Sequence, residues 1–89
     1  MGRYFFHFHN GIEVPDLLGQ DLPSFAAAHS HALAEVREMA VDAVRNGYLD
    51  LSYRVEVTDP HGNEIVTVSI ADAIRLMPDG HLPRATDRE

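Results

Sequence analysis

The sequence contains no cysteine and, although seven residues are basic, no lysine. Without cysteine the chain has no disulfide bond, no thiolate nucleophile and none of the zinc sites that depend on thiolates. A chain of 89 residues buries only about 60–65% of the surface that it exposes when unfolded, so its core is thin. Stability must therefore come from packing alone or from association with another chain, and we expect oligomerisation.

Long apolar runs and catalytic motifs are also missing. No apolar run approaches the roughly 18–20 residues of a transmembrane helix, and the first residues lack the basic-then-apolar order of a signal peptide. We therefore expect a cytoplasmic protein. The chain has no glycine-rich phosphate loop, and its serines lie in capping, helical or strand contexts rather than on a nucleophile elbow. The sequence thus predicts a protein that is not an enzyme.

The charge balance is acidic. Fourteen carboxylates against seven arginines give a net charge of −7, which repels phosphate backbones and argues against nucleic acid or an anionic membrane as a partner. The six histidines would offset all but one of these charges if every imidazole were protonated. We therefore expect solubility or oligomeric state to change between about pH 7.5 and pH 5.5.

Residues 3–9 have the pattern of a β-strand with two unlike faces. Side chains of a strand alternate between its faces. One face then carries three aromatic rings, Tyr4, Phe6 and Phe8. The other carries Phe5, His7 and His9. We expect the first set to be the floor on which a helix packs, and any function to lie on the second set, so that His7→Ala should leave folding unchanged.

The next residues predict a hairpin, a loop and a long helix. Asn10-Gly11 is a strong hairpin signal, with residues 12–14 as a short return strand. Residues 15–23 are expected to form an irregular loop, into whose base three leucines tuck: Leu17, Leu18 and Leu22. The helix would begin after a Ser24 cap and end at Gly47. On a helical wheel His29 falls near the middle of the apolar face, as a histidine at the core boundary, and His31 points elsewhere.

The second half predicts another hairpin and a short helix. Residues 49–57 alternate apolar and polar side chains as a strand with one buried face does, and residues 65–68 form its return strand. Ser69 and Asp72 have the spacing of a capping box that opens a short helix, which would continue to Met77 and end at Pro78. The predicted fold is α+β: a three- to four-stranded, mainly antiparallel sheet in the order β-β-α-β-β-α, with the long helix across one face. Residues 1–77 would form the single domain and residues 78–89 a flexible tail.

These residues together resemble a known family. The opening Arg-Tyr-Phe-Phe-His of residues 3–7 precedes a turn glycine, and the loop has a Pro-Asp, Gly and Leu-Pro spacing. With the alanine-rich helix, a Val-Thr-Asp turn and a late Ala-Asp-Ala, they look like a family of short bacterial proteins of unknown function. The similarity spans residues 3–75 and is most specific at its opening. The resemblance implies the extent of the domain, and the family has no assigned activity.

His7 and His9 are the candidate metal ligands. One residue separates them, so both imidazoles lie on one side of the strand with Cα atoms about 7 Å apart, which suits one zinc or nickel ion. A third ligand would come from His29, His61, Asp16 or Asp21, and no spacing rule selects among them. Under the alternative interpretation, both histidines are solvated or lie in an interface.

Phe5 favours the interface. A single helix leaves one face of the sheet uncovered. On that face Phe5 would form an apolar patch beside the polar imidazoles of His7 and His9. In the alternative, the loop leucines or the short helix cover Phe5. The leading prediction is a small cytoplasmic interaction module that self-associates, or binds another protein, through this face or a strand edge. Two alternatives remain: a histidine-based metal or small-ligand binding domain, and an antitoxin-like or regulatory partner protein.

Overall fold

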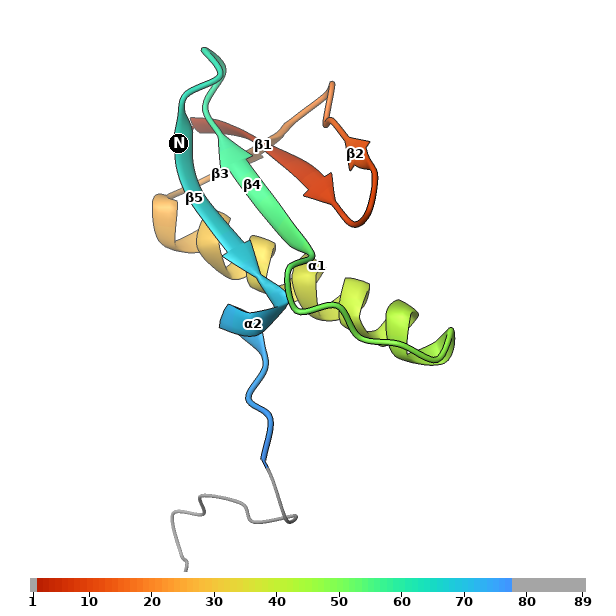
Figure 1. The fold of residues 1–89 in the computed structure, drawn as a ribbon. Coiled ribbons are helices and arrows are strands. Elements are labelled where there is room, and N and C mark those ends of the chain that lie inside the picture. Colours follow the sequence, from red (N-terminus) through yellow and green to blue (C-terminus); the bar gives the residue numbers. More distant parts are fainter. Residues whose placement is uncertain (1, 78–89) are drawn as a thin grey trace, which may run out of the picture.

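The computed structural model describes residues 2–77, which form a sheet covered on one face by a long helix (Figure 1). In chain order the elements are β1 (Gly2–His9), β2 (Glu13–Val14), β3 (Gln20–Leu22), α1 (Phe25–Arg45), β4 (Arg54–Thr58), β5 (Glu64–Ser69) and α2 (Ile70–Ala73). The predicted α+β class and the order of the predicted elements are confirmed. The tail predicted at 78–89 lies outside the described residues.

The sheet is antiparallel throughout, and β1 is its central strand. Its order is β2-β1-β4-β5, and β3 also pairs with β1. β2 pairs with the end of β1 at His9, whereas β3 pairs with the beginning of β1 at Gly2. The strand β3 lies in the stretch that we predicted as an irregular loop. Three residues are too few for alternation to predict a strand, and it forms here because β1 offers them a pairing partner.

Helix α1 begins and ends as predicted. The Ser24 hydroxyl accepts a hydrogen bond from the Ala27 amide at 3.1 Å, which satisfies one of the free amides at the start of the helix. Asn46 follows the last helical residue, and Gly47 then adopts a φ of 89°, the left-handed conformation that glycine reaches without strain.

The core lies between α1 and the aromatic face of β1. Phe6 is buried there, and Tyr4 and Phe8 pack partly buried beside it, so the predicted orientation of this face is confirmed. Small side chains on α1 allow the helix to approach the sheet closely. The buried residues of α1 are Ala28, Ala32, Val36, Met39, Ala40 and Ala43. The second hairpin contributes Val55, Val57 and Val68 to the core, and α2 contributes Ile70.

The prediction for the two helix histidines was wrong. His29 lies at the margin of the buried stripe and stacks on Phe25, with ring centroids 6.0 Å apart. His31 contacts the core instead, with its ring centroid 4.6 Å from that of Phe6. The helical wheel included Phe25 in the buried face, and this moved the predicted centre of that face toward His29. Phe25 is 50% exposed, because the first turn of α1 leaves it without cover.

Two boundaries in the second half also differ. The strand predicted from Leu49 begins only at Arg54, because the Asp50 carboxylate accepts hydrogen bonds from the Ser52 amide and hydroxyl and folds the chain into a turn. The capping box is confirmed, since Ser69 and Asp72 each bond the backbone of the other. The short helix nevertheless ends at Ala73. Neither helix of the described chain is long and apolar enough to span a bilayer.

Candidate interaction surfaces

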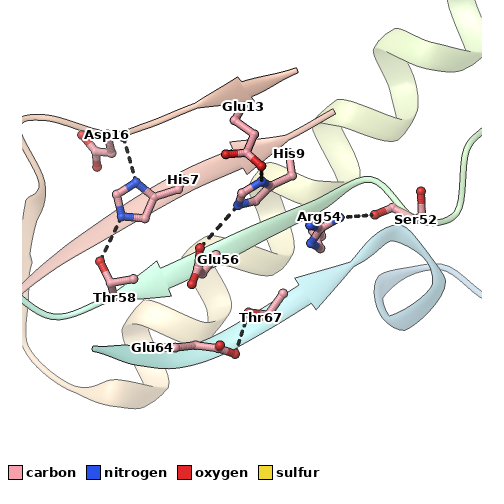
Figure 2. Close-up of polar contacts among 10 residues, drawn as sticks. All are labelled: His7, His9, Glu13, Asp16, Ser52, Arg54, Glu56, Thr58, Glu64 and Thr67. Atoms are coloured by element: carbon pink, nitrogen blue, oxygen red, sulfur yellow. Dashed lines mark hydrogen bonds and ion pairs between the residues drawn. The ribbon is translucent and has the colours of Figure 1, made fainter. Parts of the chain in front are cut away.

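The sheet face opposite α1, which we call the histidine face, carries the residues in which we expected function. His7 and His9 project from β1 beside the outward side chains of β4, as Figure 2 shows. Glu56 and Thr58 are those neighbours. The face is polar, and most of its side chains are engaged with one another.

His7 links two segments of the fold through both of its ring nitrogens. The Asp16 backbone amide lies 3.0 Å from Nδ1, and Thr58 Oγ1 lies 2.9 Å from Nε2 (Figure 2). A backbone amide only donates, so Nδ1 must accept, and the proton of the neutral ring is on Nε2, which donates to Thr58. His7 thereby ties the connection between β2 and β3 to the buried threonine of β4.

Asp16 is the centre of this connection. Its Oδ2 accepts from the Phe6 amide at 3.1 Å, and its Oδ1 accepts from the amides of Leu18 and Gly19 at 3.0 Å each. Desolvation of the carboxyl acts to raise the pKa of Asp16, but the three amides outweigh it and hold that pKa below its usual value. Sequence reasoning offered Asp16 only as a metal ligand. The signal for its actual role was Pro15-Asp16 followed by Gly19, since aspartate commonly bonds the backbone of its own turn.

His9 sits between two carboxylates. Its Nδ1 lies 3.6 Å from Glu13 of β2 and its Nε2 lies 3.4 Å from Glu56 of β4 (Figure 2). The imidazole is largely covered, whereas Glu13 is exposed. His9 therefore joins the two strands that flank β1 by polar contacts across the sheet.

The candidate metal ligands are not brought together. His29 lies on α1, behind the sheet from His7, and His61 lies in the turn between β4 and β5. Asp21 pairs with Arg3 at 3.2 Å. In residues 2–77 no three histidine or carboxylate side chains are arranged to hold a metal ion. Binding through His7 Nδ1 would also require release of the Asp16 amide.

The leucine turn, residues 15–19, exposes two side chains that we predicted to tuck inward. Leu17 and Leu18 are 84% and 82% exposed, so that prediction was wrong, whereas Leu22 does pack against the core. The bonds from the amides of Phe6, Leu18 and Gly19 to the Asp16 carboxylate hold the turn in a conformation that leaves both leucine side chains outside the core. Gly19 closes the turn at a φ of 73°, where an added Cβ would lie 2.8 Å from the Phe5 ring. The turn thus covers Phe5.

A second apolar surface, which we call the α1 groove, lies on the side of α1 away from the histidine face. It is a cavity of about 530 Å³ between the end of α1 and the segment after α2. Its apolar walls are Ala40, Val41, Val44, Leu49 and Ile74. Arg37 and Arg45 border it, and Arg37 Nε donates to the Ala73 carbonyl at 3.2 Å. Sequence reasoning missed this groove, although Val41 and Val44 on the outer side of a helix are its signal.

The opposite margin of α1 is acidic. A cavity of about 420 Å³ there is lined by Glu35, Glu38, Asp42, Asn10, Met39, Ala43, Phe8, Tyr48 and Tyr53. Burial raises the pKa of Glu35 above its usual value, and the nearby His31, 3.0 Å away, opposes this only in part. The two sides of the helix therefore carry opposite charge.

Comparison with known proteins gives a family but no function. The sequence model of a family described as a domain of unknown function (DUF6894) matches residues 3–71, from the start of β1 into α2. No curated protein and no solved structure matches the chain. A family without known function agrees with the resemblance drawn from the sequence. A bacterial origin and the diagnostic weight of residues 3–7 stay predictions.

Proposed function

We propose that this chain, which belongs to the DUF6894 family, is a small cytoplasmic, non-enzymatic interaction module that associates with copies of itself. The observation that carries the proposal is the gathering of exposed apolar side chains at two surfaces, the leucine turn and the α1 groove. Scattered apolar side chains are ordinary on protein surfaces, whereas contiguous ones mark sites of contact.

The leucine turn is suited to binding because it is already ordered. Three amides bond Asp16, and Arg3 Nη1 donates to the Leu18 carbonyl. A partner that buries Leu17 and Leu18 would therefore immobilise little additional backbone, which is a principal cost of association. Burial of each leucine side chain is worth roughly 1.5–3 kcal/mol.

The histidine face supports the proposal less well than the apolar surfaces do. His7 and His9 are occupied by contacts within the chain, and Phe5 lies under Gly19. We therefore move the proposed contact away from Phe5, His7 and His9.

The edge strand β5 is a second route to self-association. β5 has no strand partner on its outer side within residues 2–77, and residues 65–69 lack the charged side chains that usually protect an edge. Pairing of two β5 strands would extend the sheet across two copies. Such pairing would be blocked by Thr67→Lys, which adds a charge to the edge without touching either apolar surface.

Sedimentation velocity tests the proposal. We expect the weight-average sedimentation coefficient to rise with concentration between about 10 and 500 µM, because small apolar contacts give affinities in the micromolar range or weaker. A coefficient that stays at the monomer value over the whole range would contradict self-association.

A further inference from the structure

Two surfaces of this chain match each other in shape. The leucine turn is a ridge with two nearly fully exposed apolar side chains, and the α1 groove is an apolar cavity of about 530 Å³. We propose that the leucine turn of one copy docks in the α1 groove of a second copy. This inference rests on the proposed self-association and specifies how it occurs.

The ridge is rigid and projects as a unit. Leu17 and Leu18 lie between two anchored residues, since Asp16 is bonded to β1 and Gly19 packs on the Phe5 ring. The backbone that carries both leucines is therefore held in one arrangement, which lowers the entropic cost of inserting them into a preformed cavity.

The groove offers a complementary apolar lining. Val41 and Val44 are 42% and 59% exposed on its helical wall, and Leu49 and Ile74 line it beside them. One wall of the groove is α1 and the other is the segment after α2. The hydrogen bond from Arg37 to the Ala73 carbonyl joins these two walls. The cavity has room for two leucine side chains.

The charges of the two surfaces are also complementary. Arginines at positions 37 and 45 are the charged residues that line the groove. Glu13 and Asp21 flank the turn and Asp16 lies within it, while Arg3 pairs with Asp21 and donates to the Leu18 carbonyl. In a chain of net charge −7 most pairs of surfaces repel, and this pair brings an acidic surface to a basic one.

The two surfaces do not meet within one molecule. In Figure 1 the orange connection between β2 and β3 runs across the upper part of the view, whereas α2, which adjoins the groove, lies below the sheet. Each copy therefore has one ridge and one groove to offer, and the contact is head-to-tail. Such a contact repeats from copy to copy and gives rings or open chains rather than a closed two-fold dimer.

Complementary variants test the geometry. The turn variant Leu17→Ser/Leu18→Ser removes the ridge, and the groove variant Val41→Glu/Val44→Glu fills the groove with charge. All four positions are exposed, so both variants should keep the wild-type circular dichroism spectrum and melting temperature within a few degrees. The matched control is Ile12→Ser, an apolar residue that is 69% exposed and lies outside both surfaces.

Sedimentation velocity at a concentration where the wild type associates gives the readout. We expect each variant alone to be monomeric, Ile12→Ser to associate like the wild type, and an equimolar mixture of the two variants to form a 1:1 dimer and nothing larger. In the mixture, the turn variant supplies the intact groove, and the groove variant supplies the intact ridge.

Three results would overturn the head-to-tail contact while leaving self-association in place. They are association of the turn variant at wild-type strength, association of the groove variant at wild-type strength, and a mixture that stays monomeric although both variants are folded. A wild-type protein that is monomeric at about 500 µM would instead contradict the proposed function itself.

Discussion

The histidine face and the leucine turn adjoin each other along β1, yet they use their side chains in opposite ways. On the histidine face, both ring nitrogens of His7 have hydrogen-bond partners within the chain, and the His9 ring lies between two carboxylates. On the leucine turn, Leu17 and Leu18 have almost no cover. Histidines, which often carry chemistry, make bonds within the fold here, and leucines, which are typical of a core, are the residues that we propose to contact a partner. Substitutions on the two regions should therefore separate stability from association.

The largest expected effect comes from the buried side of β1. Phe6→Ala should lower the free energy of unfolding by about 3–5 kcal/mol, because Phe6 fills the core between α1 and the sheet. Urea unfolding followed by circular dichroism measures the change. The half-exposed Phe25→Ala is the control and should cost about 1 kcal/mol or less. Equal losses from the two substitutions would mean that the faces are assigned incorrectly.

Asp16→Ala should be next, with a loss of about 2–3 kcal/mol. The substitution leaves three amides without their acceptor, those of Phe6, Leu18 and Gly19. Asp21→Ala removes only an exposed ion pair and should change the free energy of unfolding by less than about 0.5 kcal/mol.

The sign of the Asp16 pH dependence follows from its lowered pKa. The folded state binds a proton at Asp16 more weakly than the unfolded state does, so its contribution is present above the unfolded pKa of about 3.9. That contribution is lost as the pH falls through the lower pKa of the folded state. The difference in unfolding free energy between wild type and Asp16→Ala should therefore shrink in acid, and a difference that stays constant from pH 7 to pH 3 would contradict this role of the carboxylate.

His7→Ala should destabilise the fold by about 1–2 kcal/mol, since it removes two internal hydrogen bonds. From the sequence alone we expected this substitution to leave folding unchanged. His9→Ala is the comparison and should cost less than about 1 kcal/mol, because its contacts with the two carboxylates are long and partly exposed. Chemical unfolding at pH 7.5 measures the free energy of unfolding of both variants. If His7→Ala loses no more stability than His9→Ala does, the structural role proposed for His7 is contradicted.

Glu35→Gln should have the smallest effect on stability and a distinct pH dependence. Because burial raises its pKa, the folded state binds the proton more tightly, so the charged carboxylate is destabilising above that pKa and less so as the pH falls through it. The variant should match or slightly exceed the wild type at pH 7.5 and lose that advantage near pH 4. A variant less stable than the wild type at pH 7.5 would show that the pair with His31 outweighs the cost of burial.

Features that depend on neighbouring residues were predictable from the sequence. The Ser24 cap, the Ser69 capping box and the left-handed Gly47 follow from residue type and spacing, and all three are present. The aromatic face of β1 was also predictable, since alternation alone places Tyr4, Phe6 and Phe8 together.

Features that depend on contacts between distant residues were not predictable. β3 exists because it pairs with the beginning of β1, about twenty residues earlier. The exposure of Leu17 and Leu18 follows from the bond between Asp16 and the Phe6 amide, ten residues away. No local pattern encodes that bond, so the turn looked like one whose leucines could fold inward. The role of His7 depends on another contact of the same residue, the bond from the Asp16 backbone amide, nine residues away.

The most direct test of the comparison measures association rather than stability. Sedimentation velocity would compare wild type, His9→Ser and Leu17→Ser/Leu18→Ser across the same concentrations. We predict that His9→Ser associates within about threefold of the wild-type dissociation constant, and that the double leucine variant binds at least about tenfold more weakly. The reverse pattern, with association lost at His9 and kept without the two leucines, would return the contact to the histidine face and contradict the account.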